Sequence, residues 1–198
     1  MSLLILDLQK GDPTLVLDLE KEAPDLSVLR GEIAWSPHPS YPEDKEKGFD
    51  LDIFIVATDV NGKISSLEHI TYFKKKFTDN GAIAVPNDNQ VGGLDLPEIF
   101  QAKLKEISAD RMHLEVYSFI HKAQERGQNF GMIANAHFDL YDDVTGKKLR
   151  QYNLSQDYSS NTVVHIATIA RVGSNWEFRP QGVGGNHTEQ QVINAYAG

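Results

Sequence analysis

The chain has 198 residues, of which 40% are hydrophobic and 24% charged, as in an ordinary soluble globular protein. Its net charge of −9 argues against nucleic acid as a partner, because such binding relies on basic residues that neutralise phosphates. The lack of cysteine excludes disulfides, zinc–thiolate sites, iron–sulfur clusters and a cysteine nucleophile.

The length fits a single domain over residues 1–198, since no stretch in the middle resembles a linker. No apolar run reaches the roughly 20 residues needed to span a bilayer. The first eight residues lack the basic region and cleavage site of a signal peptide. We therefore expect a cytoplasmic protein without a membrane-spanning segment.

Short runs rich in β-branched and aromatic residues predict strands. In chain order they are 15–17, 28–35, 49–57, 112–120, 133–141 and 162–172. Two of these runs alternate apolar and polar residues, as half-buried antiparallel strands do. Turn signals such as Asn61-Gly62 and Asn80-Gly81 supply the positive φ that hairpins need. The pattern is typical of a sandwich or a barrel.

The remaining segments predict loops and two short helices. Residues 36–48 hold three prolines and mixed charges and should form an exposed loop. Helical patterns occur over 187–196 and around 122–127. Residues 96–107 are ambiguous: they contain helix formers, yet Phe100, Ala102 and Leu104 alternate, and propensity alone favours a helix.

Asp50 and Asp52 form the first candidate site. On an extended chain, side chains two residues apart point to the same face. Paired carboxylates repel each other unless they are protonated or bridged by a cation, and hard divalent ions prefer such oxygen ligands. The alternative is an ordinary solvated strand entry, where acidic residues are frequent.

A second group of oxygen donors occurs at 79–81 (Asp-Asn-Gly) and 86–90 (Pro-Asn-Asp-Asn-Gln). Calcium takes six to eight oxygen ligands, which an irregular loop can supply. The same residues also serve plain turns, and their spacing is not that of an EF-hand. A third candidate, His121 oriented as a base by Glu125, lacks a nucleophile in a recognisable setting. The seven histidines show no zinc spacing.

Several motifs follow one another in a fixed order. Residues 8–11 are Leu-Gln-Lys-Gly, 49–52 are Phe-Asp-Leu-Asp and 86–89 are Pro-Asn-Asp-Asn; 123–131 are Ala-Gln-Glu-Arg-Gly-Gln-Asn-Phe-Gly, followed by Asn135-Ala136. From Leu8 to Gly185 this order resembles the TerD family of tellurium-resistance and bacterial stress-response proteins. The segment 123–131 follows the family pattern Ala-x-x-Arg-x-Gln-Ser-Phe-Gly almost residue for residue.

The resemblance implies an all-β fold, a two-sheet antiparallel β-sandwich with long loops at one end and a short C-terminal helix. It also implies a strand at 98–104, against the local helical propensity. By the same similarity, calcium binds in the loops. Its candidate ligands are Asp50, Asp52, Asp88 and Asn89, together with the two acids that remain in the family's acidic loop, Asp95 and Glu98.

Two departures from the family pattern weaken the expected calcium site. Lys74 and Lys75 stand where the family has paired asparagines, and an ammonium group repels a metal. The acidic loop has also lost carboxylates, and calcium affinity follows ligand charge. We expect at most one good site in a non-enzymatic stress-response module whose partners are other proteins of a stress-response complex. The alternative is a metal-independent interaction scaffold in which Lys74 or Lys75 neutralises the acidic pocket.

Overall fold

The computed structural model describes residues 5–7, 16–37, 40, 48–90, 96–154 and 158–198. Most of the predicted loop at 36–48, and the candidate ligand Asp95, lie outside these residues.

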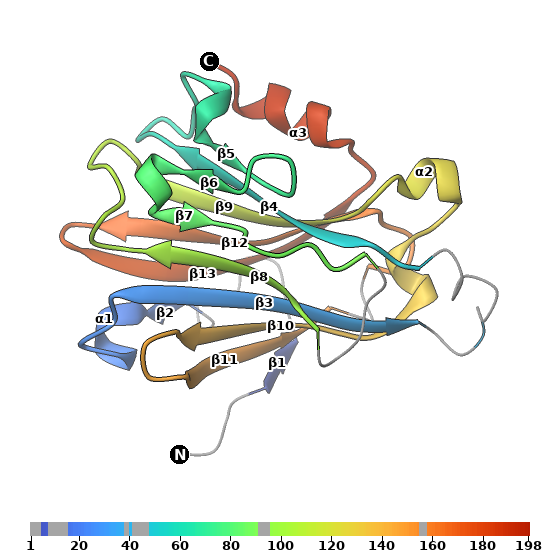
Figure 1. The fold of residues 1–198 in the computed structure, drawn as a ribbon, viewed down its shortest axis with the longest axis horizontal. Coiled ribbons are helices and arrows are strands. Elements are labelled where there is room, and N and C mark those ends of the chain that lie inside the picture. Colours follow the sequence, from blue (N-terminus) through green and yellow to red (C-terminus); the bar gives the residue numbers. More distant parts are fainter. Residues whose placement is uncertain (1–4, 8–15, 38–39, 41–47, 91–95, 155–157) are drawn as a thin grey trace.

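Two packed β-sheets make up most of the described chain (Figure 1). The first contains β1 (Ile5–Asp7), β3 (Val28–Pro37), β6 (Phe77–Thr78), β7 (Ile83–Ala84), β8 (Glu98–Lys103), β10 (Ile133–Asp142) and β11 (Lys147–Asn153). The second contains β2 (Leu17–Asp18), β4 (Leu51–Thr58), β5 (Ile70–Thr71), β9 (His113–Ile120), β12 (Val163–Val172) and β13 (Asn175–Gly185). The described helices are α1 (Leu19–Glu22), α2 (Ala123–Arg126) and α3 (Glu189–Tyr196), with 3-10 turns at Leu67–His69, Asp79–Gly81 and Phe130–Met132.

The strand order is β1-β11-β10-β3-β8-β7-β6 in the first sheet and β2-β13-β12-β9-β4-β5 in the second. The described pairs are antiparallel apart from β1 with β11. The predicted two-sheet sandwich with a short C-terminal helix is therefore confirmed. None of the described helices has the length and apolar character required to cross a membrane.

The strand β4 is buried on both faces. Leu51, Ile53 and Ile55 enter the main core between the sheets. Phe54 and Val56 point the other way, into a second apolar cluster that includes Val192 of α3. Because α3 covers this outer face, β4 lacks the apolar–polar alternation of a half-solvated strand. Asp50 and Asp52 lie in the same period-two register as Phe54, so their side chains also turn towards the side that α3 covers.

Every predicted strand run contains a strand, with ends shifted by a few residues, and the described part of 15–17 reaches β2. The ambiguous segment is β8, as the resemblance implied, and its burial alternates along the strand. Its two neighbours, β3 and β7, supply the backbone hydrogen bonds that override helical propensity. The strands β11 and β13 were missed because one is rich in polar residues and the other contains glycines and a proline.

Candidate metal centre

Asp50 and Asp52 lie where the chain enters β4, next to the end of β9. The register pairs Leu51 with Ile120, and the backbone N–H of His121 donates to the Asp50 carbonyl at 2.7 Å. Asp50 is 7% exposed and Asp52 is 4% exposed. The pair is therefore buried, which rules out the solvated strand entry considered from the sequence.

The carboxyl group of Asp88 completes a cluster with this pair. Ligand oxygens of Asp50, Asp52 and Asp88 all lie within 4.8 Å of one another. Asp88 comes from the loop after β7 and is exposed, so the cluster opens to solvent on that side. Asp50 Oδ1 and Asp52 Oδ2 are buried and accept no hydrogen bond from the described residues. Buried carboxylate oxygens normally have a partner, so this arrangement fits a bound cation.

Glu98 and Asn89 lie beside the cluster but contact each other. The buried Glu98 carboxyl accepts a hydrogen bond from the backbone N–H of Asn89, whose side-chain amide donates to the Leu96 carbonyl. Asn87 connects the same loop to β8: its amide donates to the Pro97 carbonyl at 2.6 Å, and its Oδ1 accepts from the Ile99 N–H at 3.0 Å. These contacts hold Asp88 near β4.

Burial and like charges raise the pKa values of the acidic groups at this site. Burial, reinforced by Asp50, Glu98, Glu189 and Asp88, raises the pKa of Asp52 to about 8. Burial likewise raises the pKa of Glu98 to about 8, although the Asn89 N–H opposes the shift. The pKa of Asp50 is also raised by burial, while His121 and Arg126 act in the opposite direction. Keeping these carboxyl groups ionised costs free energy, and a bound cation would offset that cost.

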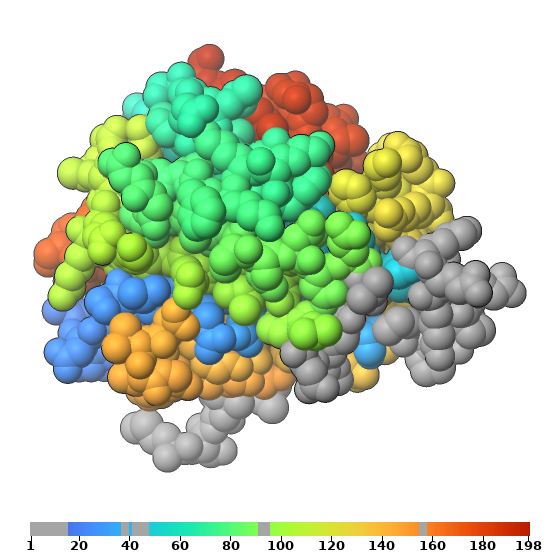
Figure 2. Space-filling model, in the orientation of Figure 1, coloured from blue at the N-terminus to red at the C-terminus, as the bar shows by residue number. Residues whose placement is uncertain are grey.

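Residues around α2 support the site, and the sequence interpretation gave them no role in it. Gln128 Nε2 donates to the Gly48 carbonyl at 2.9 Å, and Trp35 Nε1 donates to the Phe49 carbonyl at 2.7 Å. Both bonds hold the backbone just before Asp50. Figure 2 shows the segment that leads into β4 (cyan) beside α2 (yellow) at one end of the molecule. The nearly complete match at 123–131 was the signal for this support, since it contains Arg126 and Gln128.

His121 faces Asp52 rather than Glu125. His121 Nδ1 lies 3.3 Å from Asp52 Oδ2, and the Phe73 ring packs edge-on against the imidazole at 5.2 Å between centroids. Glu125 instead lies 4.0 Å from Lys122 Nζ and is exposed. The orientation of a His121 base by Glu125 is therefore not formed.

The two lysines expected to neutralise the acidic pocket have other neighbours. Lys75 contacts Glu68 and the Leu67 carbonyl, and Lys74 Nζ lies 5.0 Å from the centroid of the Phe73 ring. Neither lysine forms an ion pair with an acidic residue of the cluster among the described residues. The neighbouring positive groups are His121 and Arg126.

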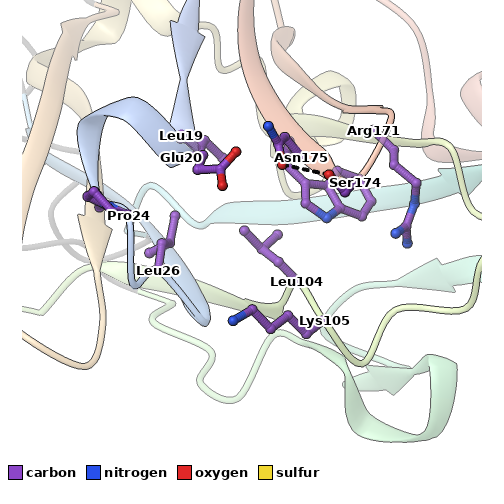
Figure 3. A pocket seen from close by; sticks show the side chains of 11 residues that line it. Leu19, Glu20, Pro24, Leu26, Leu104, Lys105, Arg171, Ser174 and Asn175 are labelled. Carbon is purple, nitrogen blue, oxygen red and sulfur yellow. Dashed lines mark hydrogen bonds between the residues drawn. The ribbon is translucent and has the colours of Figure 1, made fainter.

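The loop at 79–81 does not join the cluster. The Asp79 carboxyl accepts hydrogen bonds from the Ser108 backbone N–H and hydroxyl, so it closes a turn elsewhere. A separate pocket of about 410 Å³ lies near α1 and the β12–β13 turn (Figure 3). Leu19, Leu26 and Leu104 line it, and the Arg171 guanidinium lies 4.3 Å from the centroid of the Trp176 ring. This pocket is at the opposite end of the sandwich from α2 (Figure 1).

The fold and the site together define the class of protein: a two-sheet β-sandwich with a cluster of acidic residues at one end. The TerD domain matches residues 4–196, and the chain belongs to this family. General stress protein 16U of Bacillus subtilis (strain 168) is 28% identical over 169 residues, covering 85% of this chain and 86% of the relative. Tellurium resistance protein TerD of an Alcaligenes species is 26% identical, with the same coverage. Stress response protein SCP2 of B. subtilis (strain 168) is 28% identical over 200 residues, covering 96% and 98%.

Two solved structures share the fold. One is a protein of unknown function, SAV2460, with a TM-score of 0.70 and 18% identity, covering 85% of this chain and 95% of that chain. The other is SCO6318 of Streptomyces coelicolor A3(2), described as a homologue of telluride resistance protein TerD. It has a TM-score of 0.68 and 19% identity, with the same coverage.

Proposed function

We propose that this protein is a non-enzymatic, calcium-binding stress-response module. The observation that carries the proposal is the convergence of Asp50, Asp52 and Asp88, two of them buried with oxygens that accept no hydrogen bond from the part of the chain that the structure describes. Calcium needs oxygen ligands at about 2.3–2.6 Å, and three carboxyl groups within 4.8 Å can reach one ion with small side-chain movements. Names of relatives that refer to stress response and tellurium resistance support the cellular role.

The site would bind one ion, with the other ligands coming from its surroundings. Glu98 and Asn89 lie next to Asp88, and the hydrogen bond from the Asn89 backbone N–H involves one Glu98 oxygen and no side-chain oxygen of Asn89, so it does not prevent either side chain from contributing an oxygen to an ion. Water and loop carbonyls supply the remaining oxygens that calcium requires. Binding would order the loop that carries Asp88 and present it, together with α2, to a protein partner of the stress response.

A metal-independent scaffold is the second candidate, and the positions of His121 and Arg126 favour it. Both groups stabilise the ionised form of Asp50, so positive side chains already offset part of the negative charge. In this alternative, His121 and Arg126 take the neutralising role that the sequence assigned to Lys74 or Lys75. Calcium would then leave the stability of the protein unchanged.

Thermal unfolding in calcium and in chelator tests the calcium site. Calcium at about a hundredfold its dissociation constant adds about 2.7 kcal/mol to the free energy of unfolding. For a chain of this length, that corresponds to a rise in Tm of about 5–10 °C. Asp88→Asn removes a ligand carboxylate and should abolish most of the shift. Asp25→Asn, at an exposed position, is the matched control and should retain it. The absence of any shift in millimolar calcium would exclude the site.

A further inference from the structure

We propose that Asp52, His121 and Glu189 form a second cation site, suited to a divalent transition metal such as zinc, which fastens α3 to the end of β4 and β9. One ligand atom of each residue lies within 4.8 Å of those of the other two. The site shares Asp52 with the calcium cluster but takes its other ligands from different elements, so it can be tested separately. It adds a metal-held contact between α3 and the sheet to the function proposed above.

The spacing of His121 and Asp52 fits two ligands of one ion. Their Nδ1 and Oδ2 atoms lie 3.3 Å apart. Two ligands of a tetrahedral zinc ion with bonds of about 2.0–2.1 Å lie about 3.3 Å from each other. The Glu189 carboxyl, within 4.8 Å of both, is the nearby group that can provide a third ligand.

The buried oxygen of Asp52 points into this group. Asp52 is 4% exposed, and its Oδ2 accepts no hydrogen bond from the described residues although it faces the imidazole. A neutral imidazole with its Nδ1 lone pair turned to a carboxylate would repel it. The contact is therefore satisfied either by a proton on one of the two atoms or by a metal held between them. The experiment below separates these two states.

The fold positions the other two ligands independently. His121 directly follows β9, and the Phe73 ring restricts its imidazole from one side. Glu189 is the first residue of α3, whose start is closed by a capping box between Thr188 and Gln191. Val192 anchors the same helix in the outer apolar cluster. The sequence could not suggest this site, because residues 52, 121 and 189 belong to three separate elements.

The ligand types indicate a transition metal rather than calcium. Calcium takes oxygen ligands, whereas one imidazole with two carboxylates suits zinc and related ions. Three protein ligands leave a fourth position for water. Glu189 also lines a pocket of about 330 Å³ between α2 and the start of α3. Figure 2 shows the two helices, yellow and red, next to each other at the surface.

Zinc titration of the metal-free protein, followed by calorimetry, tests the site. The wild type should bind one zinc ion at this site, and Glu189→Gln and His121→Gln should each weaken its binding at least about tenfold. Two matched controls should bind like the wild type: Glu125→Gln on α2 and His113→Gln at the other end of β9. Absence of zinc binding by the wild type, or equal binding by all five proteins, would overturn the proposal and leave a direct Asp52–His121 contact without a metal.

Asp88→Asn separates this proposal from the calcium site. This variant should lose the calcium shift in Tm and keep zinc binding, because Asp88 is not among the three zinc ligands. Loss of zinc binding in Asp88→Asn would assign the zinc to the calcium cluster and refute a second site. If calcium does not raise the Tm of the wild type but zinc still binds, only the proposed calcium function is excluded.

Hydrogen exchange of the α3 amides tests the fastening itself. Zinc should slow exchange over Glu189–Tyr196 in the wild type and not in Glu189→Gln. Tight zinc binding that leaves this exchange unchanged would refute the link between the metal and α3.

Discussion

At the scale of single residues, Asp52 holds the least favourable position of the acidic cluster. Because β4 is buried on both faces, Asp52 lies beneath α3 rather than in water. Its neighbours are the carboxyl groups of Asp50, Asp88 and Glu189, together with the His121 imidazole. An ionised carboxylate in such surroundings is costly unless a cation or a proton compensates it. The chemistry of this end of the molecule therefore depends on what occupies that space.

Metal-free protein should lose stability as the pH rises from about 4 to about 8. Asp52 has a pKa near 3.8 when unperturbed and about 8 in the folded state, and Glu98 is shifted to a similar value. Between these pH values the folded protein holds more protons than the unfolded chain, so its free energy of unfolding falls with rising pH. Denaturant unfolding in chelator at several pH values measures the slope.

Two further samples control this pH experiment. Asp52→Asn removes one of the titrating groups and should flatten the slope, and saturating calcium should do the same by stabilising the ionised carboxylates. A free energy of unfolding that rises between pH 5 and pH 8 in chelator would contradict the raised pKa values of Asp52 and Glu98.

At the scale of secondary-structure elements, the packing of β3 depends on Gly31. This strand lies between β10 and β8, and Gly31 pairs with Leu140 on one side and Phe100 on the other. A Cβ atom at Gly31 would lie 2.1 Å from Phe100 Cε1 and 2.7 Å from Phe138 Cζ. These two rings stack with centroids 6.2 Å apart, so the missing side chain makes room for them. Glycine usually weakens a strand, but at position 31 the side chains of the neighbouring strands require it.

Gly31→Ala should destabilise the protein by about 1–3 kcal/mol, because the added methyl group overpacks the core. Denaturant unfolding at constant pH measures the loss. Adding Phe100→Leu to the variant should restore part of the stability, since the smaller side chain vacates the space. Full stability of the single variant would show that β3 moves away from the rings at little cost.

At the scale of the whole molecule, the two ends of the sandwich differ in chemistry. The acidic cluster, α2 and the start of α3 meet at one end, whereas the pocket beside α1, lined by both apolar and polar side chains, lies at the other (Figure 1). Each end has its own tryptophan. Trp35 donates to the Phe49 carbonyl next to Asp50, and Trp176 packs under Arg171. The rigid sheets between them should keep calcium binding local.

Calcium should therefore change the fluorescence of Trp35 and leave that of Trp176 unaffected. The physical reason is that an ion on Asp50 shifts the electric field and backbone immediately beside the Trp35 indole. Trp176→Phe should keep the calcium response, and Trp35→Phe should abolish it. A response that disappears with Trp176 instead would show that binding reaches the far end of the sandwich.

Local patterns in the sequence determined much of the fold and the centre of the candidate site. Period-two alternation and turn residues identified the main strands, because both arise from the geometry of a single extended chain. The same period predicted that Asp50 and Asp52 share a face, and the structure bears this out by bringing them together. The motif order from Leu8 to Gly185 identified the family and corrected the propensity at 98–104.

Only the tertiary structure decided which distant groups meet at the acidic end. Residues separated by tens of positions come together through sheet pairing and helix docking, and no local pattern encodes those distances. Glu189 lies beside Asp52 because α3 covers β4, and His121 lies there because β9, which it follows, pairs with β4. Tertiary contacts likewise place Lys75 beside Glu68 instead of in the cluster. The strands β11 and β13 likewise formed against their composition, because neighbouring strands supplied the hydrogen bonds.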